Sequence, residues 1–265
     1  MDEWDRVLEA LRRAGLDLSA YKEPQLERRL ESFLQRESFP SLAPFLEALD
    51  TNRDLFRRFY SYLTIHVTEF FRDVPYWAAF RSALEAQGRR HVSLWSAGCS
   101  WGAEPVTAAV ILEDLGLSYD ILATDTDELM LDAARTGRFS RAELEKVPPP
   151  YRRHFRVVGA EAVEAVLERG RIAFRRHDLV AEPPPGQFDV VICRNLIIYF
   201  RPPARAVALE RLAQAVKPGG FLFLGATETF LEAQHWGFQV AAPALFYKKS
   251  AETSEQSQTP RVESW

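Results

Sequence analysis

The stretch "HVSLWSAGCSWGAEP", residues 91–105, decides the fold. It predicts an apolar strand, a turn containing Gly98 and Gly102, and a helix with Pro105 in its first turn. Gly98, Ser100 and Gly102 also have the G-x-S-x-G spacing of a hydrolase nucleophile elbow, in which a strained turn exposes a serine. The stretch therefore indicates either a serine nucleophile or a backbone turn that cradles a nucleotide-like cofactor.

The residues after this stretch alternate short apolar strands with helices. "DILATDTD" (120–127) predicts a strand and "ELMLDAARTG" (128–137) a helix. Further strands are predicted in "FDVVICRNLIIYF" (188–200) and "GGFLFLGATE" (219–228), and a terminal hairpin in "GFQVAAPALFYKK" (237–249). Such alternation is typical of an α/β fold with a doubly wound, mostly parallel sheet.

The chain divides into regions with different patterns. Residues 1–65 carry apolar side chains at helical spacing throughout, which predicts a helical N-terminal domain. Residues 90–249 carry the strand–helix alternation, and a segment at about 141–172 interrupts it, which indicates a small inserted subdomain. Residues 250–265 have the composition of a disordered tail.

Composition argues against several classes of function. A net charge of −4 does not indicate a basic nucleic-acid-binding surface. No apolar run approaches the roughly 18 residues of a membrane span, and the acidic, amphipathic N-terminus does not match a secretory signal. Cys99 and Cys193 are too few for a disulfide framework or a four-ligand metal site. We therefore expect a cytoplasmic protein without a metal centre.

Neighbouring residues decide between the alternatives for the glycine-containing turn. A hydrolase elbow follows several strands of its sheet, but everything upstream of Ser100 is helical, which disfavours a serine nucleophile. A dinucleotide would place its pyrophosphate at the helix N-terminus, where Glu104 would repel it, and the fingerprint G-x-G-x-x-G is absent. Glu104 suits a cationic ligand without phosphate, and S-adenosylmethionine, with an amino group and a sulfonium, is such a ligand.

Acidic and polar residues at other strand ends support a nucleoside-containing ligand. Asp125 could accept both ribose hydroxyls, or it could cap the following helix, a role that Asp127 could fill instead. Asp178 could meet the adenine amino group, or it could be an ordinary capping residue of a turn. Arg194 and Asn195 lie between apolar runs, which favours active-site groups over satisfied structural ones. Tyr199 adds a hydroxyl nearby.

Several separate motifs give the chain a resemblance to a known family. They are "LTIHVTEFFRD" (63–73), "WSAGCSWGAEP" (95–105), "ATDTDELMLDAARTGRF" (123–139), "FDVVICRNLIIYF" (188–200) and "VKPGGFLFLGATETF" (216–230). With these motifs in this order, roughly residues 1–249 resemble the chemotaxis receptor methyltransferases, which are CheR-type protein-glutamate O-methyltransferases.

The resemblance implies a fold and a set of cofactor contacts. The fold is that of a class I S-adenosylmethionine-dependent methyltransferase, with an all-α N-terminal domain, a small inserted β-subdomain, and residues 66–89 as a linker and helix crossing the cofactor site. The implied cofactor contacts are His66, Thr68, Arg72, Glu104, Asp125, Asp178, Leu179, Arg194 and Asn195. This chain departs from the family pattern at His66, where Asn is usual, at Ala103, where Glu is common, and in "GATE" (225–228), where relatives have a "GHSE"-like segment.

The resemblance also implies an activity and a partner. The protein would transfer a methyl group from S-adenosyl-L-methionine to glutamates in the cytoplasmic methylation region of chemoreceptors, leaving S-adenosyl-L-homocysteine. Arg72 would orient the glutamate carboxylate, and Tyr199 would shape the path of the methyl group. We expect a monomer that binds no nucleic acid, reaches the membrane only through receptors, and recognises them without their tether peptide. The alternatives are a methyltransferase with another acceptor and a cofactor-binding regulatory module without turnover.

Overall fold

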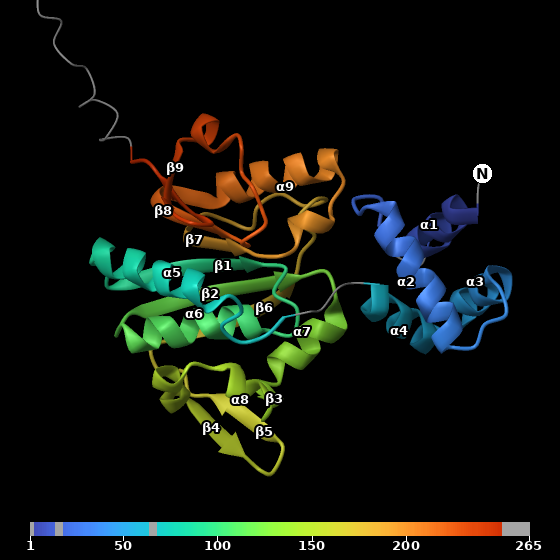
Figure 1. Ribbon diagram of the computed structural model, residues 1–265, viewed down its shortest axis with the longest axis horizontal. Helices are drawn as coiled ribbons and strands as arrows, with labels where there is room; N and C mark the ends of the chain where they lie inside the picture. The colour runs from blue at the N-terminus through green and yellow to red at the C-terminus, as the bar shows by residue number, and fades with distance from the viewer. Residues whose placement is uncertain (1–2, 14–17, 64–67, 251–265) are drawn as a thin grey trace, which may run out of the picture.

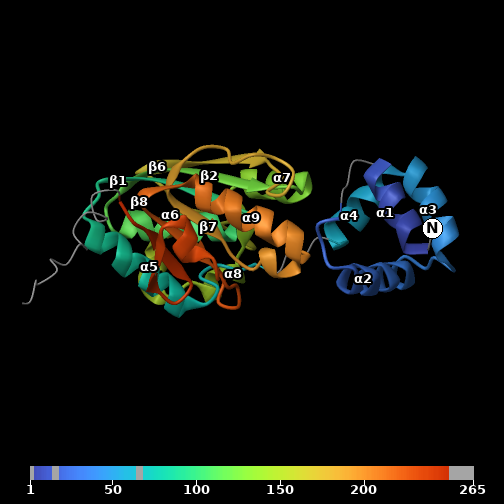
Figure 2. The ribbon, with the colours of Figure 1, turned by 90° about the horizontal axis from the view of Figure 1, so that it is seen from above.

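The computed structural model describes residues 3–13, 18–63 and 68–250, without the side chains of Glu3, Trp4, Gln25 and Asp50. A helical domain lies beside a larger domain built on a β-sheet, as both ribbon views show (Figures 1 and 2). A small second sheet lies at the edge of the larger domain (Figure 1).

The helical domain consists of α1 (Glu3–Arg13), α2 (Glu23–Arg36), α3 (Leu42–Thr51) and α4 (Arg53–Leu63). The apolar residues at helical spacing form a core of their own, in which Phe45 contacts both Phe33 and Phe59 at centroid distances of 5.9 and 4.7 Å. The domain therefore folds around its own aromatic centre, because amphipathic helices must bury their apolar faces against one another.

The large sheet contains seven strands in the described part of the chain. They are β1 (His91–Ala97), β2 (Ser118–Asp125), β6 (Gly170–Arg176), β7 (Phe188–Cys193), β8 (Val216–Leu224), β9 (Phe238–Ala242) and β10 (Leu245–Lys248). Their order is β6-β2-β1-β7-β8-β10-β9, parallel from β6 to β8, with β10 antiparallel to both of its neighbours. This arrangement confirms the predicted mostly parallel sheet, and β9 and β10 form the predicted hairpin.

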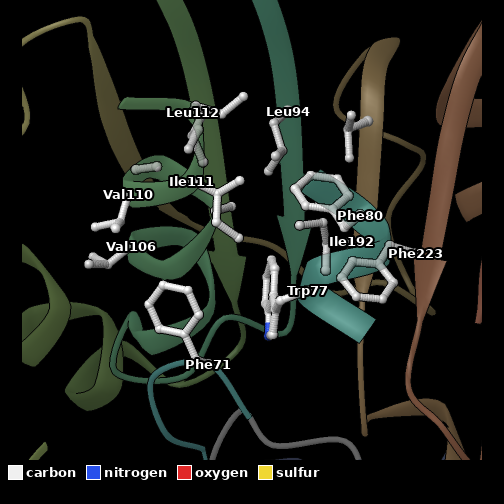
Figure 3. Packing of buried hydrophobic residues seen from close by; sticks show 14 of the residues in the cluster. Phe71, Trp77, Phe80, Leu94, Val106, Val110, Ile111, Leu112, Ile192 and Phe223 are labelled. Carbon is white, nitrogen blue, oxygen red and sulfur yellow. The ribbon is translucent and has the colours of Figure 1, made fainter. Parts of the chain in front are cut away.

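Helices cover both faces of the large sheet. On one face lie α5 (Val74–Gln87), α6 (Ala103–Asp114) and α7 (Glu128–Arg135), and on the other lies α9 (Pro202–Ala215). Figure 3 shows the first of these interfaces, where side chains of α5 and α6 pack against Leu94, Ile192 and Phe223 of the strands. The sheet is therefore buried on both sides, as its nearly continuous apolar strands require.

The inserted segment forms a three-stranded antiparallel sheet in the order β3-β5-β4. It consists of β3 (Arg138–Ser140), α8 (Glu143–Lys146), the short helix η1 (Pro149–His154), β4 (Phe155–Val158) and β5 (Ala162–Ala165). The small sheet begins three residues before the predicted segment of 141–172, and Gly170 already belongs to the large sheet. Strand pairing sets these limits, and pairing between distant residues cannot be read from local periodicity.

The order of the strands places a crevice at one edge of the large sheet. From β1 the chain moves outward to β2 and β6, then crosses to β7 on the other side of β1. Ligands of open α/β sheets bind at such a reversal, outside the carboxyl ends of the strands. Within the described residues, no helix is long and apolar enough to cross a membrane.

Candidate functional site

A cavity of about 400 Å³ opens at the carboxyl ends of β1, β2 and β7, and residues of the helical domain form one of its walls. That volume falls in the range typical of small-molecule sites. The predicted site residues that line it are Thr68, Arg72, Glu104, Asp125, Asp178, Leu179, Arg194, Asn195 and Tyr199. His66 lies outside the described residues. The fold thus brings together nine side chains, seven from four of the five motifs and two, Asp178 and Leu179, from the turn after β6, although their roles toward a ligand stay predictions.

The turn after β1 is held close to two neighbouring segments. Gly98 and Gly102 have φ values of +80° and +94°, a conformation that glycine adopts without strain. A Cβ at Gly98 would lie 2.6 Å from the end of the Leu196 side chain, which would have to shift to admit it. The Ser100 amide donates to Asp125 Oδ2 at 2.8 Å. These contacts describe a tightly packed backbone turn between β1 and α6.

Glu104 lies in the first turn of α6 and is 8% exposed. Its Oε1 accepts a 2.7 Å hydrogen bond from the Ser96 hydroxyl of β1. Burial raises the pKa of Glu104 to about 7, although Arg194 and the Ser96 hydrogen bond act in the opposite direction. Burial disfavours the charged form of this carboxylate, and a cation placed beside it would favour that form. A cationic ligand is the type that the sequence predicts.

Two aspartates after β2 have different partners. Asp127 caps α7, because its Oδ1 accepts from the Leu129 amide at 2.8 Å and, more weakly, from the Met130 amide at 3.4 Å. Asp125 accepts from the Ser100 amide and, at 3.0 Å, from the Asp127 amide. The capping role therefore belongs to Asp127, and Asp125 joins the ends of β1 and β2 at the cavity wall.

Asp178 shapes the turn after β6. Its Oδ1 accepts from the amides of Val180 and Ala181 at 2.8 and 2.9 Å, which is the capping arrangement considered as the alternative from the sequence. The residue nevertheless lines the cavity together with Leu179. Asp178 therefore has a structural role in the turn, and a contact with an adenine stays a prediction.

Arg194 is the buried cation of the site, with a side chain only 3% exposed. Its guanidinium forms a 2.9 Å ion pair with Asp73 and lies over the rings of Trp77 and Phe223, at 5.2 and 4.9 Å from their centroids. Its Nε is buried and has no hydrogen-bond partner among the described residues. A buried donor without a partner is costly, so this atom is suited to an acceptor supplied by a ligand.

The segment 68–73 is an irregular linker, and α4 ends before it at Leu63. Phe71 and Asp73 have φ values of +52° and +60°, which non-glycine residues rarely adopt. The Phe71 amide donates to Thr107 Oγ1 at 3.1 Å, and the Phe70 ring contacts three aromatic side chains of the sheet domain: Trp101, Phe139 and Phe155. The two buried phenylalanines thus anchor the strained linker that carries Thr68 and Arg72 along the cavity.

The helical domain and the linker contribute several residues that could not be assigned to the site from the sequence. Tyr21, Lys22 and Tyr60 line the cavity, although nothing in their local sequence distinguishes them from other helical-domain residues. Asp73 was quoted within a motif but given no partner, and only the fold shows its pairing with Arg194. No group of three or more His, Cys, Asp or Glu side chains that could hold a metal ion occurs in the described ranges.

Nearly the whole chain matches known protein families and relatives. A family profile described as "CheR methyltransferase, SAM binding domain" matches residues 66–245, and one described as "CheR methyltransferase, all-alpha domain" matches residues 2–64. A chemotaxis protein methyltransferase of Listeria innocua is 34% identical over 230 residues, 84% of this chain and 88% of the relative. Chemotaxis protein methyltransferase 2 of Pseudomonas aeruginosa is 32% identical over 248 residues, 88% of this chain and 89% of that protein.

Proposed function

The chain belongs to the CheR methyltransferase family, and we propose that it methylates glutamate side chains in the cytoplasmic methylation region of chemoreceptors. The family assignment makes it a methyltransferase with an S-adenosylmethionine-binding domain. The names of its relatives, which are chemotaxis protein methyltransferases, support the choice of partner. The convergence of Glu104, Asp125 and Arg194 on one cavity is the structural observation that carries the proposal.

The side chains of the cavity fit S-adenosylmethionine in charge. The ligand's positive groups would be held by Glu104, a buried carboxylate at the cavity that accepts a hydrogen bond from Ser96. Its carboxylate would be held by Arg194, whose buried Nε has no partner among the described residues. Its ribose hydroxyls would be held by Asp125, at the tip of β2. Acidic and basic side chains at one cavity therefore match a ligand that carries both charges.

The reaction depends more on positioning the glutamate carboxylate against the methyl group than on acid–base catalysis. An oxygen of the glutamate carboxylate bonds to the methyl carbon while the carbon–sulfur bond breaks and its electron pair leaves with sulfur, giving a methyl ester and S-adenosylhomocysteine. Because a glutamate carboxylate is already ionised near pH 7, no base has to remove a proton. The chain's contribution is to orient the carboxylate, through Arg72, and to exclude water from the cavity.

Two measurements in sequence test this proposal. Calorimetry with S-adenosylmethionine is expected to show binding to the full chain at one site. Incubation with the radiolabelled ligand and receptor cytoplasmic fragments is then expected to label the fragments, with the label lost when their methylation-region glutamates are changed to alanine. Binding without label on any receptor fragment would overturn the proposed acceptor and favour a regulatory module, and label that survives the alanine changes would overturn glutamate as the methylated residue.

The Arg72→Ala variant tests the assigned role of Arg72. It is expected to lower methyl transfer by about 10- to 100-fold, because a charge-assisted contact to the acceptor contributes about 1.5–3 kcal/mol. Initial rates of label transfer at saturating cofactor measure the effect. Arg90→Ala, which removes an exposed arginine outside the cavity, is the matched control and is expected to leave the rate unchanged. A rate within threefold of wild type for Arg72→Ala would contradict the role.

A further inference from the structure

A buried carboxylate outside the predicted site supports the turn that carries two of its residues. Glu228 follows β8 and is 5% exposed. Its Oε2 accepts from the amides of Asn195 and Gly225 at 2.9 and 2.7 Å. Its Oε1 accepts from the amides of Leu196 and Ile197 at 3.0 and 2.9 Å. Four backbone donors therefore converge on one side chain, two on each oxygen.

These hydrogen bonds stabilise an unusual backbone at the end of β7. Asn195 has a φ of +59°, in the left-handed region that few residues other than glycine adopt. Three successive amides, from Asn195 to Ile197, point toward one place, and such a cluster of parallel N–H groups needs an anion. Without the carboxylate, the turn would have buried donors with no partner, a state that costs free energy at each amide.

The backbone around Glu228 is shaped for this contact. A Cβ at Gly225 would lie 2.7 Å from Glu228 Oε2 and 2.9 Å from the Asn195 nitrogen, so neither atom could stay in place. Glycine at position 225 is thus required for the carboxylate to reach the turn. The "GATE" segment (225–228) therefore provides both the anion and the space that it occupies.

The other side of the same turn faces the helical domain. The Lys22 amide donates to the Tyr199 carbonyl at 2.9 Å, and the Arg201 amide donates to the Ala20 carbonyl at 2.8 Å. The Lys22 ammonium donates to the Ile198 carbonyl at 2.7 Å, in an exposed position. The turn is thus held from inside by a buried carboxylate and from outside by the chain segment 20–22, so that Glu228 is its anchor on the sheet side.

We infer that Glu228 is a positioning residue for the methyltransferase site: through four backbone hydrogen bonds it sets the conformation of the turn 195–199, and thereby the placement of Asn195 and Tyr199 in the cavity. Glu228 does not line the cavity itself, so it acts through these residues. The inference rests on the proposed function in taking S-adenosylmethionine as the ligand.

The Glu228→Gln variant tests the inference. An amide has one acceptor oxygen, so glutamine leaves two of the four backbone donors without a partner in either orientation. We expect the dissociation constant for S-adenosylmethionine, measured by calorimetry, to rise about tenfold, which corresponds to the loss of about 1.4 kcal/mol of binding free energy. Glu232→Gln makes the same change in charge at an exposed residue of the same loop and is expected to bind like wild type.

A double-mutant cycle with Asn195→Ala separates positioning from a general loss of stability. If Glu228 acts through Asn195, the two substitutions together are expected to weaken binding little more than Asn195→Ala alone. Glu228→Asp, which keeps the charge, is expected to recover part of the affinity. If Glu228→Gln does not fold, Gly225→Ala replaces it in the cycle, because its methyl group would displace the same carboxylate.

The possible results separate the inference from the proposed function. Wild-type protein that does not bind S-adenosylmethionine would overturn the proposed function. Wild-type protein that binds, with a folded Glu228→Gln or Gly225→Ala variant that binds within twofold of it, would overturn the inference alone. Fully additive effects in this cycle and in the same cycle with Tyr199→Ala would also overturn it, because the effect of Glu228 would then pass through neither residue.

Discussion

Two buried glutamates, Glu104 and Glu228, follow strands at the same edge of the sheet but differ in their hydrogen-bond partners. Glu104, after the turn that follows β1, is 8% exposed, and Glu228, in the loop after β8, is 5% exposed. Burial raises the pKa of both. Among the described residues, however, Glu104 has one hydrogen bond, from Ser96, whereas Glu228 has four from the backbone. The backbone therefore supplies the hydrogen-bond donors that Glu228 needs, whereas Glu104 lines the cavity, where a ligand can contact it.

This difference shows how a buried charge can be assigned a role. A carboxylate surrounded by amides of its own chain holds the backbone, because its removal leaves those donors without partners. A carboxylate that lines a cavity and has few partners is a binding group, because a ligand can supply what the chain does not. Neither exposure nor the direction of the pKa shift distinguishes the two residues, so the hydrogen-bond partners decide.

The largest expected difference between the two residues concerns stability without cofactor. Glu228→Gln is expected to lower the free energy of unfolding by about 3 kcal/mol, since two buried amides lose their acceptor at roughly 1–3 kcal/mol each. Glu104→Gln is expected to raise it at pH 8 by about 1–3 kcal/mol, because the folded state no longer holds a buried charge whose pKa lies near 7. Urea unfolding of both variants measures these changes.

Effects of equal sign and size in that experiment would remove the distinction between the two carboxylates. Glu145→Gln serves as the control for the change in charge, because Glu145 is exposed on α8, away from the cavity. Its free energy of unfolding is expected to stay within about 0.5 kcal/mol of the wild-type value.

The second prediction concerns affinity. Glu104→Gln is expected to weaken S-adenosylmethionine binding by about 10- to 100-fold, because a charge-assisted contact contributes about 1.5–3 kcal/mol. Calorimetry at pH 7.5 measures the dissociation constant. A variant that is more stable than wild type and still binds worse would separate binding from folding, whereas unchanged affinity would contradict the assignment of Glu104 to a cation.

The smallest predicted effect is a dependence of affinity on pH. The pKa of Glu104 is about 7 without ligand, so below that pH Glu104 must lose its proton before it can hold a cation. The affinity for S-adenosylmethionine is therefore expected to rise about tenfold from pH 5.5 to pH 7. The sign is opposite for stability without ligand. There the unfolded state loses its proton first, near pH 4.5, so this residue's contribution to stability falls as the pH rises through about 7.

Glu104→Gln is the matched control for this pH dependence. Its affinity is expected to change less than threefold between pH 5.5 and pH 7, because glutamine does not titrate and the ligand's amino group stays protonated in this range. The same slope in the variant as in the wild type would assign the titration to another group of the cavity.

Much of the fold and several site residues could be predicted because they depend on local patterns. The period of apolar residues indicated the helices and strands, and the carboxyl ends of parallel strands must meet, so Glu104, Asp125 and Arg194 could be expected at one place. The start of the small sheet at Arg138 could not be predicted, because β3 pairs with β5 more than twenty residues away. Tyr21 and Tyr60 reach the cavity only through the packing of the helical domain.

The sequence by itself determined that "GAEP" (102–105) places an acid at a helix start, where a pyrophosphate is repelled and a cation is favoured. It also determined the mostly parallel sheet, since the alternation of strands and helices is a local property of the chain. Only the tertiary structure decided what the second glutamate, in "GATE" (225–228), does. Three of the four amides that surround Glu228 belong to a turn about thirty residues earlier, and only folding brings those donors to its carboxylate.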